Sequence, residues 1–189
     1  MRPKPFNPST KMSLRGFTLT ETMVVVAILA ILIALAAPNF TPIIERWRVR
    51  QAVENMTSTM YFARSEAIKR GGNIGIQKNA KNTDGCTLAD TKQEWGCGWF
   101  VFVDSNGNGA WNSGEEKLQI FAPPTMINVM HNSGSENIKV NRWGQMDGLN
   151  AKGFTLSPEP AGISSPATQS ICVASGGRIR VIEGTPCTP

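Results

Sequence analysis

The chain has 189 residues, 41% of them hydrophobic, which is enough for one folded domain and an appendage. Its formal net charge of +5 arises mainly at the N-terminus, because residues 1–16 hold four basic residues and no acidic one, while the rest holds 15 basic and 14 acidic residues. This balance argues against a protein that binds nucleic acid over its whole surface.

An apolar run without charged residues follows the basic N-terminus. It extends over 23 residues, Thr22–Ile44, and as a helix it would measure about 34 Å, enough for a bilayer core of roughly 30 Å. The preceding basic residues predict a cytoplasmic N-terminus, with the rest of the chain outside. A conventional secretory signal, cut after residues 34–36, is the alternative. Glu21 argues against it, because it lies where the apolar stretch of a signal should start cleanly, and Pro38 follows closely behind the proposed cut.

The residues around Glu21 resemble the class III signal of type IV prepilins and pseudopilins. The stretch 15–21, RGFTLTE, places a glycine, an aromatic residue and a glutamate between a basic leader and the apolar run. The resemblance implies that a prepilin peptidase cuts between Gly16 and Phe17, methylates Phe17 and leaves the apolar helix in place. It also implies that Glu21 neutralises the α-ammonium of a neighbouring subunit during assembly.

A second helical pattern continues beyond the apolar run. Apolar residues recur there at steps of three and four, which predicts one buried stripe of a helix. The stripe consists of Val49, Val53, Met56, Met60, Ala63 and Ala67. Gly71-Gly72 is a plausible stop, and Pro38 and Pro42 predict a kink near the membrane exit. We expect the stripe to pack against the chain's own sheet.

After Gly72 the pattern changes to short extended runs separated by Gly, Asn, Pro and Ser, which predicts an antiparallel β-domain. The runs are 73–77, 98–103, 117–121, 127–130, 138–140, 153–156, 170–174 and 178–182. Together with the resemblance, they predict an α+β, pilin-like fold. Its expected parts are a cleaved leader (1–16), a long helix with a transmembrane half and an amphipathic half (17–72), and an antiparallel β-sheet head (73–189).

Two stretches of the head resemble the FimT/FimU/GspH group of minor pilins and pseudopilins. They are GWFVFVDSNGNGAWNSGEEKLQIF (98–121) and GRIRV (177–181). The resemblance implies a structural subunit and not an enzyme. It implies a single-pass inner-membrane protein with a periplasmic head that later enters a filament at the cell surface. Its implied partners are the prepilin peptidase, an inner-membrane assembly platform and other major and minor pilins.

The resemblance leaves the pilus and the secretion branches open. The cysteine-bounded C-terminal end favours a minor type IV pilin, which would serve pilus initiation and assembly and thereby twitching motility, adhesion or DNA uptake. A minor pseudopilin of type II secretion is the alternative. A periplasmic protein with a conventional signal remains a third possibility.

The four cysteines favour disulfides over zinc, because none forms a CxxC pair and the chain is expected to be exported. Four cysteines allow three connectivities, of which we expect the local one, Cys86–Cys97 and Cys172–Cys187. The second bridge would close a loop of about 16 residues, worth about 3 kcal/mol in the chain-entropy treatment.

Residues 104–115 fit the twelve-position calcium-loop pattern, with Asp104, Asn106, Asn108 and Glu115 as candidate ligands. However, a strand-like run enters the loop where an EF-hand has a helix, and Asn-Gly pairs are typical of hairpin turns. We therefore expect a plain turn, with bound calcium as the alternative, and no other cofactor or metal.

Gly177, Arg178 and Arg180 match a GRxR motif. In a strand both arginines point to one face, so a solvated terminal strand is the simple interpretation. The resemblance adds a second interpretation, because in the FimT-like branch a C-terminal GRxR motif binds DNA during natural transformation. Two arginines meet only a few phosphates, so binding of double-stranded DNA would be weak, sensitive to salt and independent of sequence.

Catalytic motifs find little support. The single histidine, His131, has no nucleophile motif beside it and is expected at the surface or in a turn. No P-loop or dinucleotide fingerprint occurs. The tryptophans at 95, 99, 111 and 143 could form a sticky surface, but we expect them in the core, where aromatic residues of strand runs usually lie.

Overall fold

A computed structural model of the chain describes residues 16–36, 40–147, 152–174, 177–184 and 187. The chain divides into two compact units, Met1–Thr41 and Pro42–Pro189. The amphipathic helix therefore belongs to the same unit as the strands, and this head unit begins about thirty residues before the expected boundary at 72/73.

The first unit contains helix α1, Leu19–Ala36. Thr18 begins it as an N-cap, because its Oγ1 accepts a hydrogen bond from the Glu21 amide at 3.2 Å. The large apolar side chains between Met23 and Leu35 are all exposed. Within the described ranges, no helix has both the length and the apolar character required to span a membrane.

The helix predicted as one element over 17–72 occurs as two. Helix α2 spans Thr41–Arg70, with Pro42 near its start, where the missing N–H of proline leaves no donor unsatisfied. Pro38 lies outside the described residues. All six residues of the predicted apolar stripe are buried in α2. The helix ends where Gly71 adopts a φ of 78° and the Gly72 amide bonds to the Ala67 carbonyl at 2.7 Å.

Each predicted extended run forms a strand, and within the described part of the chain the strands make two antiparallel sheets of four. In the first, the order is β3 (Lys117–Phe121), β2 (Trp99–Val103), β1 (Ile74–Lys78) and β5 (Asn137–Val140). In the second, it is β4 (Ile127–His131), β6 (Lys152–Pro158), β7 (Gln169–Val173) and β8 (Ile179–Glu183). The 3₁₀ turns η2 (Thr83–Gly85) and η3 (Gly162–Ser164) lie in loops. The α+β prediction is confirmed.

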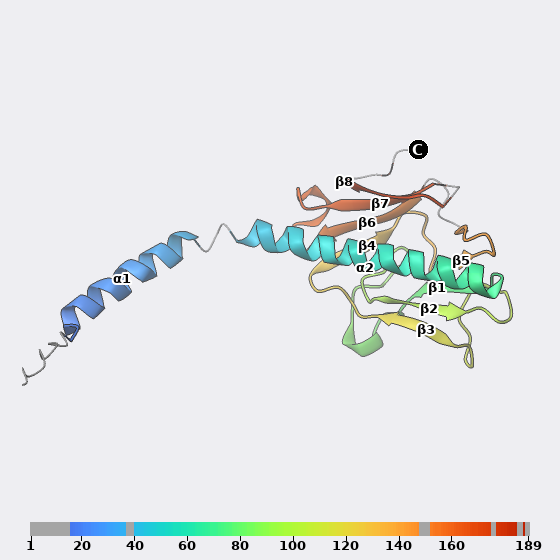
Figure 1. The fold of residues 1–189 in the computed structure, drawn as a ribbon, viewed down its shortest axis with the longest axis horizontal. Helices are drawn as coiled ribbons and strands as arrows, with labels where there is room; N and C mark the ends of the chain where they lie inside the picture. Colours follow the sequence, from blue (N-terminus) through green and yellow to red (C-terminus); the bar gives the residue numbers. More distant parts are fainter. Residues whose placement is uncertain (1–15, 37–39, 148–151, 175–176, 185–186, 188–189) are drawn as a thin grey trace, which may run out of the picture. The chain divides into compact units, whose positions relative to one another are not determined.

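One core holds the head unit together. Side chains from α2 and from strands of both sheets form a single buried cluster, and Figure 1 shows α2 lying across the strands of the two sheets. The buried Trp99 donates from Nε1 to Thr59 Oγ1 at 2.9 Å, so these polar atoms of the core are paired as well.

The expectation for His131 is wrong. It is fully buried in β4, with its ring centroid 4.7 Å from that of Phe154 and 5.6 Å from that of Trp95. Burial alternates along β4, and His131 falls on the inward-facing register. Ser133 and Ser135 provide hydrogen-bond partners for the imidazole nitrogens, which makes an aromatic residue with polar nitrogens acceptable there.

Candidate functional site

The expected processing site lies at the beginning of the described residues. Gly16 and Phe17 precede α1 without helical structure, and Phe17 is 81% exposed. A methyl-sized group added to Gly16 would meet no atom within 4 Å. Glu21 occupies the first turn of α1 and is exposed, where the partial positive charge of a helix N-terminus favours a carboxylate.

Both expected disulfides are present. Cys86 is bonded to Cys97 and Cys172 to Cys187. The second bond attaches the C-terminal end to β7, at the residue that faces Arg180 of β8. It therefore closes the chain around the strand that carries the GRxR motif.

The two motif arginines are available to solvent. Arg178, directly before β8, and Arg180, within β8, are both exposed, and β8 is an edge strand of the second sheet. Within residues 177–184 and the other described ranges, neither guanidinium has a hydrogen-bond or ion-pair partner.

Arg64 of α2 is a functional candidate that the sequence did not indicate. Its Nη1 donates to the Gly177 carbonyl at 3.1 Å. Gly177 is buried at a φ of 80°, and a Cβ there would lie 3.3 Å from Arg64 Nη1. The positive φ therefore favours glycine at this position of the motif, and a larger residue would also press on the end of the Arg64 side chain. In the sequence, Arg64 looks like any other basic residue on the polar side of α2.

The calcium candidates form a hydrogen-bonded turn. Glu115 accepts from the amides of Ser105 and Asn112 at 2.9 and 2.8 Å. Asn106 and Asn108 each accept from a backbone amide two residues later. Asp104 Oδ2 accepts from the Gly109 amide at 2.8 Å. These bonds hold the turn together without a bound ion, and among the described residues no three His, Cys, Asp or Glu side chains gather into a group that could hold a metal.

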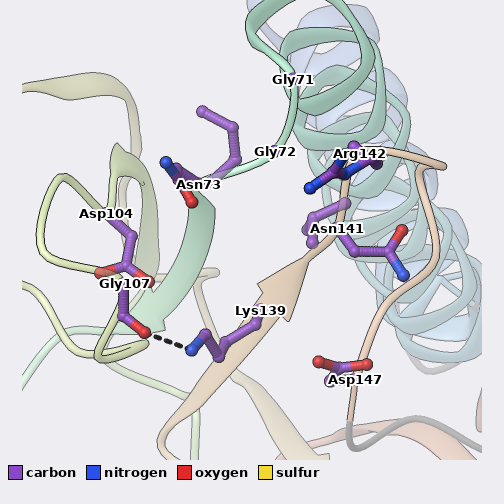
Figure 2. A pocket seen from close by; sticks show the side chains of 11 residues that line it. Gly71, Gly72, Asn73, Asp104, Gly107, Lys139, Asn141, Arg142 and Asp147 are labelled. Carbon is purple, nitrogen blue, oxygen red and sulfur yellow. Dashed lines mark hydrogen bonds between the residues drawn. The ribbon is translucent and has the colours of Figure 1, made fainter.

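Asp104 also borders a pocket of about 200 Å³ between the end of α2, the start of β1 and β5. Figure 2 shows Asp104 and Asp147 on opposite sides of it, with Lys139 between them donating to the Gly107 carbonyl. Arg142 also lines the pocket. Asp104 Oδ1 is buried and has no hydrogen-bond partner among the described atoms. With two cations among its lining residues, the pocket is poorly suited to a metal ion.

Lys78 of β1 is a buried cation with a structural role. Its Nζ donates to the carbonyls of Ala89 and Thr91, which holds the segment that contains the Cys86–Cys97 bond against the first sheet. Burial lowers the pKa of Lys78 below 10.5, and the nearby carboxylates of Glu136, Glu94 and Asp90 oppose that shift.

Comparisons with known proteins agree with this arrangement. The family model described as type II transport protein GspH matches residues 52–179, and the prokaryotic N-terminal methylation motif matches residues 11–37. Pilin-like protein PilA1 of Thermus thermophilus is 28% identical over 172 residues, which cover 90% of this chain and 93% of that protein.

The fold is also that of a solved minor pilin. Two crystal structures of type IV minor pilin FimU from Pseudomonas aeruginosa superpose with TM-scores of 0.51 and 0.53 at 20% identity. They cover 74% and 76% of this chain and 99% and 97% of theirs. Since the GspH model matches more than half of the chain, the chain belongs to the GspH family of minor type IV pilins and pseudopilins.

Proposed function

We propose that this protein is a minor type IV pilin that helps to initiate and assemble a pilus. The observation that carries the proposal is helix α1, whose large side chains are almost all apolar and exposed. The helix lies within the residues that match the N-terminal methylation motif and begins four residues after Arg15. Such a helix is unstable in water and needs lipid or other apolar helices around it. Its proposed environments are the inner membrane before assembly and a bundle of pilin helices afterwards.

Glu21 supplies the specificity of that bundle. A carboxylate surrounded by apolar helices is costly unless a cation pairs with it. The proposed cation is the N-methylated α-ammonium of a neighbouring pilin. Because peptidase cleavage creates that α-ammonium, processing and assembly on the inner-membrane platform are coupled. The head remains in the periplasm and later on the filament.

Mass spectrometry of the protein purified from membranes tests the processing step. The expected N-terminus is a methylated Phe17. A chain that begins at Ala37 would refute the proposal, because α1 would then have been removed by a conventional signal peptidase.

The assembly step is tested by Glu21→Ala in the full chain. We expect normal cleavage but loss of the protein from sheared filaments, because the neighbouring α-ammonium loses its partner. Glu54→Gln is the matched control, since Glu54 is an exposed carboxylate of α2 and should leave incorporation unchanged. Incorporation of the Glu21 variant at the wild-type level would contradict the assigned role.

A pseudopilin of type II secretion is the alternative within the family. Deleting the gene distinguishes a pilin from a pseudopilin, because loss of a pilus subunit reduces surface filaments, whereas loss of a pseudopilin blocks the release of folded exoproteins. Loss of secretion with intact pili would favour the alternative.

A second function, binding of DNA through Gly177, Arg178 and Arg180, is favoured by the exposure of both guanidiniums and by the contact of Arg64 with Gly177. Reversing both charges (Arg178→Glu with Arg180→Glu) should abolish retardation of duplex DNA in a low-salt gel shift, and moderate salt should do the same to the wild type. Unchanged retardation by the double variant would refute this function. The same double charge reversal should leave assembly intact.

A further inference from the structure

Trp143 is exposed on a loop that its own hydrogen bonds hold in one conformation. The indole is 73% exposed, in contrast to the core position expected for the tryptophans. Asn141 Oδ1 accepts from the amides of Trp143 and Gln145, both at 3.0 Å, and the Gly144 amide bonds to the Asn141 carbonyl at 2.8 Å. A large apolar side chain presented by a rigid turn loses little entropy on binding and is typical of recognition surfaces.

This loop lies against the residue that holds the GRxR motif. A Cβ on Gly144 would be 2.5 Å from Arg64 Cγ, and one on Gly177 would be 3.3 Å from Arg64 Nη1. Arg64 is therefore in contact with both glycines, one beside Trp143 and the other beside Arg178. Figure 1 shows the loop after β5 and the beginning of β8 at the end of the head unit where α2 terminates.

The charges at this end are mainly positive. Arg142 is exposed beside Trp143, and Arg178 and Arg180 are exposed on the other side of Arg64. Asp147 is exposed as well and lines the same pocket as Arg142, so it offsets part of the local charge. The negatively charged phosphates of a nucleic acid can pair with these exposed arginines. The exposed indole can in addition stack on a flat apolar group such as a nucleic-acid base.

We propose that Trp143 is a base-stacking residue of a nucleic-acid surface formed by Arg142, Trp143, Arg178 and Arg180, with Arg64 as the residue that positions its two halves. This rests on the DNA-binding function proposed above and deepens it. The surface takes DNA with unpaired bases, such as a single strand or a frayed duplex end. Base faces are stacked on one another inside a duplex and are not available to an indole there.

The experiment compares three probes with the full chain in non-ionic detergent at low salt. They are a labelled oligo-dT of about thirty nucleotides, a duplex of the same length whose two ends are closed by non-nucleotide linkers, and heparin, which carries charge without bases. Fluorescence anisotropy gives each affinity. Trp143→Ala should weaken oligo-dT binding about 5- to 100-fold, as loss of one stacked base predicts, and should change duplex and heparin binding less than about two-fold.

Trp47→Ala is the matched control, because Trp47 is also exposed (63%) but lies near the start of α2, and we expect no change with any probe. Trp143→Phe should restore most oligo-dT binding, which a merely structural role of the indole does not predict. Equal losses for all three probes, or oligo-dT binding by Trp143→Ala at the wild-type level, would overturn the stacking role.

Different outcomes would refute DNA binding by the motif arginines and base stacking by Trp143. If the wild type binds neither DNA, the DNA-binding function itself is wrong. If charge reversal at Arg178 and Arg180 abolishes binding while Trp143→Ala changes nothing, the function stands and only the stacking surface is refuted.

Discussion

Helices α1 and α2 follow each other in the chain, yet the apolar stripe of α2 and the apolar side chains of α1 have opposite surroundings. In α2, Val49, Met56 and Met60 are completely buried against strands of both sheets. In α1, residues such as Leu29 and Ile33 are 51% and 66% exposed. Burial inside the chain's own head stabilises α2, whereas α1 can gain comparable stability only from lipid or from other subunits.

This difference separates two roles within one protein. The α2 stripe forms part of the core of the head, whereas the role proposed for α1 is to hold the folded head in a membrane or a filament. Variants of the two helices should therefore affect different measurements, and the following predictions test that separation from the largest effect to the smallest.

Met60→Ala should lower the unfolding free energy of the head by about 2–5 kcal/mol, because it leaves a cavity in a close-packed core. The measurement is urea unfolding of the full chain in mild detergent, followed by tryptophan fluorescence. Leu29→Ala in α1 is the matched control and should leave the transition unchanged. If both variants shift the midpoint equally, the two helices are not energetically separate.

Replacing Cys172 and Cys187 together by serine should cost about 3 kcal/mol, because the bond closes a loop with a sequence separation of 15 and restricts the unfolded chain. The same unfolding assay measures the effect. Processing at Gly16 should not change, since the bond lies in the head unit. A loss of cleavage would indicate that the peptidase requires a stable head.

Gly144→Ala should destabilise the head by more than the roughly 1–2 kcal/mol that a left-handed backbone costs an alanine. Its φ is 73°, and the new Cβ would also collide with Arg64 Cγ at 2.5 Å. Gly162→Ala is the control, because its φ of 69° is similar and nothing lies within 4 Å of its added Cβ. Equal losses would show that Arg64 moves aside at no cost.

Lys78 should produce the smallest effect, a dependence of stability on pH. Burial lowers its folded pKa below 10.5, so between that lowered pKa and 10.5 the unfolded chain binds more protons than the native one. The unfolding free energy should therefore rise with pH in this window. Lys78→Met removes the titrating group and should flatten this part of the profile in urea titrations. If Lys78→Met leaves the dependence of the unfolding free energy on pH unchanged, other titrating groups cause that dependence.

Much of the fold could be predicted because its signals are local. The stripe from Val49 to Ala67 follows the 3.6-residue period of a helix, and runs such as 98–103 are bounded by turn residues. The disulfide pairing was also predicted from the short sequence separations within each cysteine pair, 11 and 15 residues. The burial of His131 could not be predicted in this way, because its inward register depends on how β4 pairs with β6.

The candidate surface around Arg64 illustrates the same limit. The GRxR motif is contiguous and can be found by inspection, but Arg64, Gly144 and Gly177 are brought together only by packing of α2 against two loops. The prediction that Trp143 lies in the core, as Trp95 and Trp99 do, is wrong. The sequence pattern does not distinguish a buried indole from an exposed indole in a turn.

The sequence by itself determined the processing motif before α1, the buried stripe of α2 and the position of every strand, because each depends on neighbouring residues along the chain. Only the tertiary structure decided that the described strands form two sheets, that His131 lies inside, and that Arg64 lies against both Gly144 and Gly177. Those outcomes depend on contacts between residues far apart in the chain, whose free energies no local pattern records.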